Sequence, residues 1–185
     1  MKIEVKKIKH ARSLSEETNA FTGALYVNDE HFADCKNSGH GGSTDIYPKY
    51  SEDEKKRKHY REMIEEADAF CKTLPNVESD FSAEGLKMSL EFFIDLEVEK
   101  DLRNKDVQSV LKKLDKESLK SVVIISKKKF DDFVSGKTLE LPQKLYGWNR
   151  PINQIPVEVL KKQLPSIKTK MVDDEFIYNK NLPND

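Results

Sequence analysis

The sequence predicts an α+β protein with an N-terminal antiparallel three-stranded meander, central helices and a C-terminal strand–helix–strand part. Three observations predict this class. Apolar residues alternate with polar ones through most of the first 36 residues, as in half-buried strands. From residue 51 onward they recur at helical spacing. The β-branched run Ser121–Ser126 is typical of a strand buried on both faces.

The meander is predicted strand by strand. In residues 3–8 the alternation slips at Lys6–Lys7, which indicates a β-bulge in the first strand. Two further strands are expected over 19–27 and 30–36. Asn28–Asp29 between them suits a two-residue turn, because Asn and Asp tolerate positive φ.

The middle of the chain predicts helices. Ser51 and Glu54 form a capping box, so a helix is expected to begin there and to end before Pro75. A second helix over about 82–103 is apolar on more than one face, which favours a buried central position. A shorter helix is expected over 106–114.

The pattern after the buried strand is less regular. Residues 127–150 show no sustained apolar period, so a short helical turn, an extended stretch over 138–141 and irregular backbone are expected. A helix is expected over Pro156–Pro165, since proline is accepted at the first position of a helix. Residues 167–171 are expected to form a closing strand. Asp173–Glu175 is expected to be an exposed turn.

Length and composition indicate how many domains the chain forms. They favour one domain over residues 1–178, with a weak seam near 104–120 and a loose tail over 179–185. Charged residues make up 35% of the 185, and the mean hydropathy is -0.71. These values indicate a polar protein that folds around periodic apolar faces.

The charge and the cysteine content limit the possible partners and the cellular compartment of the protein. A formal net charge of -1 gives no overall attraction to nucleic acid or to an anionic membrane, so neither is an expected partner. No stretch has the length and apolar character of a signal-peptide core or a membrane span. Cys35 and Cys71 form no CxxC pair and suit a reducing compartment, so a cytoplasmic location is expected.

The segment Asn37–Asp45 is the most informative stretch, because it holds three of the seven glycines and one of the four histidines. Successive amides of a glycine-rich turn can bind a nucleotide phosphate or another small anion. The segment is not a Walker motif, since no Lys precedes its Ser and Thr. The alternative is a structural connection whose glycines let the chain cross the sheet tightly. The candidate ligand-binding residues are Asn37, Gly39, His40, Gly41, Gly42, Ser43, Thr44 and Asp45.

His40 is also a candidate general base, oriented by Asp45 or paired with Cys35. The competing interpretation is a histidine that packs across the hairpin or bonds to backbone. Glu91 and Asp95 lie four residues apart on one helix and are interpreted as solvated acids. The sequence therefore predicts no defined catalytic set, no metal site and no cofactor.

The segment 146–151 contains the only tryptophan. Tyr146, Trp148 and Arg150 belong to residue types that are common at the hot spots of protein interfaces, so they form a candidate partner surface. The alternative is that Trp148 fills the edge of the core, because a small domain needs large aromatic side chains.

Two segments resemble a family of uncharacterised bacteriophage and mobile-element proteins. Phe21–Asn28 is similar to a hairpin with an aromatic residue, a small residue, Leu-Tyr, a hydrophobic residue and Asn or Asp. Asn37–Gly42 is similar to an Asn-Asp-Gly-His/Gln-Gly-Gly loop, with Ser38 in place of the acid. The likeness is specific in the first quarter of the chain and extends elsewhere only to the order of elements. It implies a protein of the host bacterial cytoplasm, where inhibiting a host component, such as part of a defence system, is a common task.

Three functions are therefore open. The first is a small cytoplasmic binding protein that sequesters or inhibits a host protein. The second is a binder of a nucleotide or another small anion at residues 37–45. The third is an enzyme that uses His40 with Asp45 or Cys35.

Overall fold

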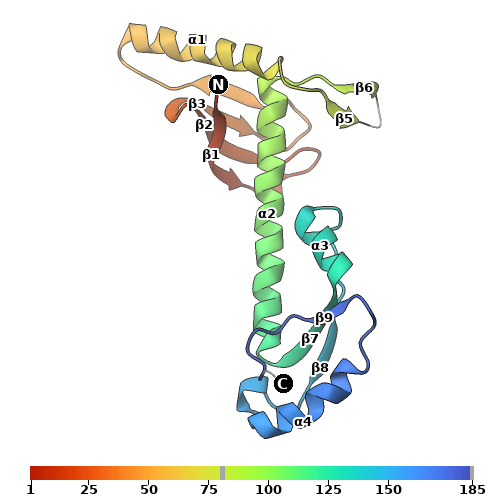
Figure 1. Cartoon of the computed structure of the whole chain (residues 1–185). Helices are drawn as coiled ribbons and strands as arrows, with labels where there is room; N and C mark the ends of the chain where they lie inside the picture. The colour runs from red at the N-terminus through yellow and green to blue at the C-terminus, as the bar shows by residue number, and fades with distance from the viewer. Residues whose placement is uncertain (80–81, 184–185) are drawn as a thin grey trace. The chain divides into compact units, whose positions relative to one another are not determined.

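The computed structural model describes residues 1–79 and 82–183 (Figure 1). The chain forms two compact units, Met1–Leu102 and Arg103–Asp185, called unit 1 and unit 2 below. Their boundary lies inside helix α2 (Leu90–Ser118). The sequence predicts one domain with a seam near 104–120; in the structure each unit has hydrophobic clusters of its own.

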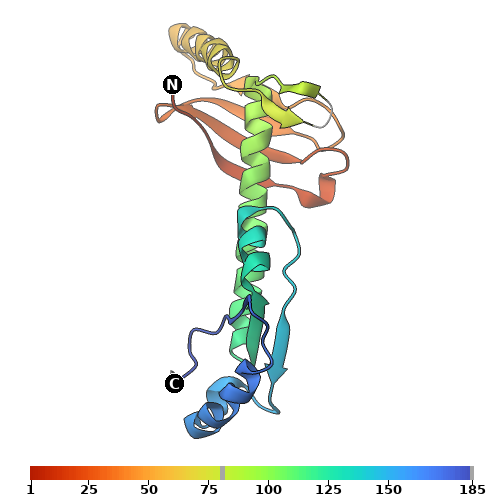
Figure 2. The same cartoon turned by 45° about the vertical axis from the view of Figure 1, so that its right-hand side comes forward.

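Unit 1 is built on a four-stranded antiparallel sheet in the order β1-β2-β3-β4, whose strands lie side by side in both views (Figures 1 and 2). The strands are β1 (Ile3–His10), β2 (Phe21–Val27), β3 (Glu30–Asn37) and β4 (Asp45–Pro48), with the 3-10 turn η1 (Arg12–Leu14) after β1. The predicted meander is confirmed, and β4 adds a fourth strand after the glycine loop.

Two predicted irregularities of this sheet are present. Asn28 and Asp29 have φ of 49° and 70°, as a two-residue hairpin turn with positive φ requires. On β1 the register shifts between Lys6 and Lys9, and Lys7 has φ of 56°. The slipped alternation in the sequence therefore marks a β-bulge.

Helix α1 (Glu54–Cys71) and the first half of α2 pack against one face of the sheet. Each large apolar side chain buried there stabilises the fold by about 1.5–3 kcal/mol. The largest fully buried side chains of this core are Leu25, Phe32, Cys35, Cys71, Leu90, Ile94 and Val98.

The start of α1 differs from the prediction. The helix begins at Glu54 and not at Ser51. Asp53 is the N-cap, since its side chain accepts a hydrogen bond from the amide of Lys55 at 2.8 Å. Ser51 instead bonds the amide of Asp53, one step outside the helix.

The second predicted helix also begins later. The strands β5 (Val77–Ser79) and β6 (Ser82–Leu86) form an antiparallel pair, and Gly85 has φ of 74°, which an α-helix does not accept. α2 begins only at Leu90. It then continues through 104–105, so the two predicted helices are one. Its sequence contains neither Gly nor Pro, so nothing local ends it earlier.

Unit 2 contains a three-stranded antiparallel sheet in the order β8-β7-β9, with the predicted buried strand in the centre. Its elements after α2 are β7 (Ser121–Ser126), α3 (Lys127–Ser135), β8 (Lys144–Gly147), η2 (Ile152–Gln154), α4 (Val157–Lys168) and β9 (Glu175–Ile177). The C-terminal strand–helix–strand part is thereby confirmed. Within residues 1–79 and 82–183, no helix has both the length and the apolar character needed to cross a membrane.

Neighbouring residues of β7 point to opposite faces of the sheet, as the strand period requires. Val122 and Ile124 pack with α4, whereas Val123 and Ile125 pack with Leu114 at the end of α2. This explains why the strand is apolar at every central position.

Three elements of unit 2 differ from the prediction. The extended stretch expected over 138–141 is irregular, and the strand forms at Lys144–Gly147. The strand expected over 167–171 is the end of α4 and a turn, because Ile167 continues the buried helical stripe past Pro165. The last strand, Glu175–Ile177, was not predicted; the turn expected over Asp173–Glu175 is present at Asp173 and Asp174, and Glu175 begins the strand.

Candidate functional site

The glycine loop between β3 and β4 closes around the side chain of Asn37, which is 6% exposed. Its Oδ1 accepts hydrogen bonds from the Thr18 hydroxyl and the Gly39 amide, both at 2.9 Å. Its Nδ2 donates to the Gly42 carbonyl at 3.0 Å and to the Thr44 hydroxyl at 3.1 Å. One buried amide group therefore holds both ends of the loop, and all of its hydrogen-bonding capacity is used.

Thr44 connects the loop to α2. Its hydroxyl donates to Asp95 Oδ1 at 2.6 Å, and its amide donates to Glu91 Oε1 at 3.1 Å. These acids are half-buried at the loop, and not the solvated pair that the sequence suggests. Burial raises the pKa of Asp95; the Thr44 bond opposes this shift, and the nearby Glu91 charge adds to it.

Two of the loop glycines allow a close approach of backbone. Gly39 has φ of 91°, and a Cβ there would lie 2.1 Å from the Leu14 carbonyl oxygen. Its own carbonyl accepts hydrogen bonds from the amides of residues 16–18. Gly41 has φ of 80° and leaves room for the Glu17 carboxylate, which a Cβ would meet at 2.1 Å. The backbone contact requires glycine at Gly39, whereas at Gly41 it is the positive φ that favours glycine, since the Glu17 carboxylate can move.

The same contacts occupy three of the backbone amides that an anion could use. The amides of Gly39, Gly41 and Thr44 already donate to side-chain oxygens of the chain itself. Carboxylates of Glu17 and Glu91 lie beside these positions, and they repel an anion. Gly42 and Ser43 are exposed. This geometry gives no support to anion binding at the loop amides.

His40 lies apart from the partners considered for catalysis. It is exposed, and its Nδ1 is 3.0 Å from Glu16 Oε2. Asp45 accepts a hydrogen bond from the Tyr47 hydroxyl. Burial raises the pKa of the Cys35 thiol to about 12, so the thiol is neutral and weakly nucleophilic at neutral pH. Among the described residues, no group of three or more His, Cys, Asp or Glu side chains is placed to hold a metal ion.

Tyr146, Trp148 and Arg150 differ in exposure. The two aromatic side chains are half-buried and pack against the cluster beneath α4. The indole N–H of Trp148 donates to Gln163, and the Tyr146 ring centre lies 6.0 Å from Lys170 Nζ. Of the three predicted surface residues, only Arg150 is exposed.

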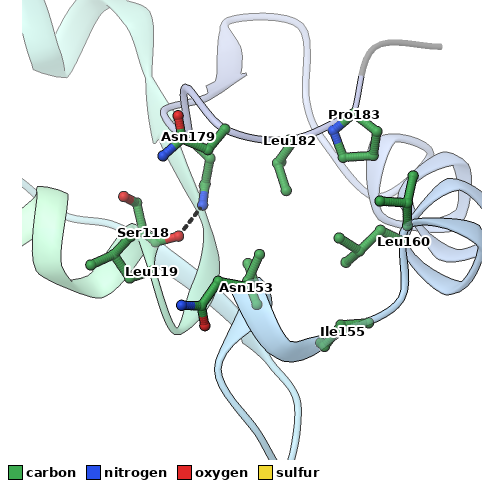
Figure 3. Close-up of a pocket in the computed structure, with 11 residues that line it drawn as sticks. Ser118, Leu119, Asn153, Ile155, Leu160, Asn179, Leu182 and Pro183 are labelled. Carbon is green, nitrogen blue, oxygen red and sulfur yellow. Dashed lines mark hydrogen bonds between the residues drawn. The ribbon is translucent and has the colours of Figure 1, made fainter.

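Unit 2 contains an open hollow of about 390 Å³, here called the unit 2 hollow (Figure 3). Figure 3 shows Leu182 of the C-terminal segment pointing toward the space between Asn153, Ile155 and Leu160. Leu119 and Val157 on its border are 49% and 50% exposed. The aliphatic residues of the lining are Leu119, Ile152, Ile155, Val157, Leu160 and Leu182.

Asn179 holds the C-terminal wall of this hollow in place. Its Oδ1 accepts from the Val123 amide at 2.7 Å, and its Nδ2 donates to the carbonyls of Ser118 at 2.7 Å and Ser121 at 2.9 Å. Of the loose tail expected over 179–185, Asn179 is thus bonded to β7 and Leu182 packs against the cluster beneath α4, while 184–185 lie outside the described residues.

The two units carry opposite charge. Unit 1 has 15 Lys and Arg against 22 Asp and Glu, a formal charge of -7; unit 2 has 17 against 11, a formal charge of +6. Lys120, Lys161 and Lys180 directly follow residues that line the hollow, as does Glu158, and Lys120 is paired with Glu117. In the described part of the chain, Lys161 and Lys180 form no ion pair.

The hollow could not be predicted from the sequence, because its walls come from separate segments around residues 119, 153, 160 and 182. The available signal was the charge of each half, since a charge asymmetry along a chain indicates a binding surface. The net charge of -1 conceals it. Comparisons with protein-family models, curated proteins and solved structures find no match to this chain.

Proposed function

We propose that this protein acts by binding another protein, through the unit 2 hollow and the lysines of the same unit. The occupant is an acidic segment of the partner that places an apolar side chain in the hollow. The observation that supports this is an aliphatic hollow of about 390 Å³ on a unit with a formal charge of +6. Covering such apolar surface contributes about 25 cal/mol per Å².

Polar groups at the edge of the hollow can bind the rest of the partner's acidic segment. Asn153 and Asn181 line the hollow and are exposed, so their amides are available to the backbone of a bound peptide. Lys161 and Lys180 supply positive charge next to the lining in sequence. An acidic peptide with an apolar anchor would match both properties.

A protein segment fits this surface better than a nucleic acid. The cations of unit 2 are 15 Lys and only 2 Arg, whereas base recognition relies on Arg and on exposed aromatic rings. The aromatic Tyr146 and Trp148 are half-buried.

The proposal keeps the role that the bacteriophage resemblance implies. A small protein that covers an acidic segment of a host component would block the other contacts of that segment, and so sequester or inhibit it. The enzyme alternative has no comparable support, because His40 contacts neither Asp45 nor Cys35 among the described residues.

The test measures fluorescence anisotropy with three labelled probes on the full chain. The first is a short peptide rich in Asp and Glu that contains two Leu; the second has Ser in place of Leu; the third is a single-stranded oligonucleotide of equal charge. We expect the first to bind most tightly. Leu119→Ala should weaken it about fivefold, because a lost aliphatic contact costs about 1 kcal/mol.

Matched variants separate the site from general effects. Leu139→Ala removes an exposed leucine of the same unit outside the hollow and should leave binding unchanged. Lys161→Gln with Lys180→Gln should weaken binding more than Lys128→Gln with Lys129→Gln. Equal binding of the Leu and Ser peptides, or tighter binding of the oligonucleotide, would contradict the proposal.

A further inference from the structure

The sheet of unit 1 has a second face, turned away from its core, that carries a row of basic side chains. Lys9 on β1, Thr22 on β2 and Lys36 on β3 are partners in register, and all three are exposed. Facing side chains on adjacent strands have Cβ atoms about 5 Å apart. The two ammonium groups can therefore reach the same space above Thr22.

The β-bulge of β1 brings a third lysine to this face. Between two regular pairs, Lys7 and Ile8 together oppose Gly23. Ile8 packs against the core, whereas Lys7 is exposed and lines a hollow with Lys9 and Lys36. Lys7 keeps a φ of 56°, a left-handed conformation that is unfavourable for a residue with a Cβ. Strain of this kind is concentrated at functional sites.

Lys7, Lys9 and Lys36 form no close ion pair among the described residues, although unit 1 contains 22 acidic residues and Asp45 on β4 is the register partner of Lys36. Lys6 on the same strand, by contrast, pairs with two carboxylates at 3.2 and 3.0 Å. Lys9 and Lys36 lie two strands apart, on either side of Thr22, and a bound anion placed between them would be attracted by both charges.

The lysines surround two adjoining hollows of about 360 and 420 Å³, both of which are lined by Lys9, Thr22 and Lys36. Tyr47 borders the first and is 50% exposed, so an aromatic face lies beside the cations. Asp34, the one acidic residue among those that line the two hollows, is bonded to a histidine of its own strand. Space, positive charge and a ring surface therefore occur together.

We infer that this face binds a small phosphate-bearing compound, with the phosphate between Lys9 and Lys36 and an attached ring against Tyr47. Two cations and the Thr22 hydroxyl provide charge-assisted and neutral donors for phosphate oxygens. The sheet holds these positions in register, so the site is organised before the ligand arrives. The site is independent of the proposed function, which concerns unit 2.

The experiment titrates isotope-labelled full-length protein with pyrophosphate, and separately with adenosine diphosphate, at constant ionic strength. Amide NMR shifts at Lys9, Thr22 and Lys36 should saturate with both compounds. Lys36→Gln should lower the affinity for both compounds about tenfold, because it removes a charge-assisted hydrogen bond to the phosphate. Tyr47→Ala should lower the affinity for adenosine diphosphate only, since pyrophosphate has no ring that could contact Tyr47.

Lys56→Gln is the matched control, because it removes an exposed lysine of α1 in the same unit without touching the sheet face. Melting temperatures identify any variant that fails to fold, and Lys9→Gln then replaces Lys36→Gln. Shifts that do not saturate, or equal weakening by Lys56→Gln, would overturn the inference. Equal affinity for the two compounds would overturn the role of Tyr47.

Discussion

At the scale of single residues, a few buried polar atoms determine the glycine loop. Asn37 forms hydrogen bonds with four groups, and one of them, the Thr44 hydroxyl, donates in turn to Asp95 on α2. A half-buried carboxylate beside another acid is unfavourable when it is ionised. The loop therefore carries a pH dependence of its own.

Asp95→Asn tests this dependence, since it removes the charge but keeps an oxygen for the Thr44 hydroxyl. The pKa of Asp95 is raised, so its contribution to stability is full below the ordinary value of 3.8 and is lost as the pH rises through the raised pKa. The variant should be more stable than the native chain at neutral pH, by less than about 1 kcal/mol after solvent screening. Below pH 3.8 the difference should vanish.

Urea unfolding at both pH values measures the difference. Asp45→Asn, which removes an exposed carboxylate of the same loop, is the control. A gain in stability that is the same at both pH values would show that the charge of Asp95 is not its cause.

At the scale of elements, α1 and α2 are joined by a capping contact between helices. Asp68 of α1 accepts a hydrogen bond from the amide of Leu90, the first residue of α2, at 3.0 Å. It also pairs with Lys72 one turn later. The Leu90 amide, and after it Lys72, lower the pKa of Asp68. One carboxylate thus satisfies a free amide at the start of α2.

Asp68→Ala should lower the free energy of unfolding by about 1–2 kcal/mol at neutral pH, because that amide loses its partner. Because the pKa of Asp68 is lowered in the folded chain, the contribution of its carboxylate to stability is fully present above the ordinary pKa of 3.8. It is lost as the pH falls through the lower pKa of the folded state. The cost of the substitution should therefore shrink in acid. Chemical unfolding followed by circular dichroism measures it. Glu65→Ala on the same helix is the control, and a comparable loss there would refute the capping role.

At the scale of the whole molecule, two separate cores share one continuous helix. The cluster of unit 1 lies within Met1–Leu102, and both clusters of unit 2 lie within Arg103–Asp185. Charge follows the same division, at -7 and +6. We therefore expect the two units to respond separately to damage in one core.

Leu25→Ala tests this separation. Leu25 is 0% exposed, so its loss should destabilise unit 1 by about 2–5 kcal/mol. The only tryptophan, Trp148, lies in unit 2, and its fluorescence transition in urea should not move. Leu160→Ala in unit 2 is the matched variant and should shift that transition. If Leu25→Ala shifts it equally, the chain unfolds as a single unit.

Local features of the fold could be predicted from the residues themselves. The bulge at Lys6–Lys7 and the turn at Asn28–Asp29 depend on neighbours in the chain, and both are present. β6 and β9 could not be predicted, because a short strand forms only where a partner strand supplies its hydrogen bonds. In the same way, the sequence identifies Asn37 and Thr44 as candidate site residues, but it does not show that Asn37 closes the loop or that Thr44 connects it to α2.

The sequence by itself determined the α+β class, the meander, the buried β7 and the helical faces, because these follow from the spacing of apolar residues along one segment. Only the tertiary structure decided where the unit boundary, the unit 2 hollow and the Lys9–Thr22–Lys36 row lie. Each of these brings together side chains from segments far apart in the chain, and no local period records which segments will meet.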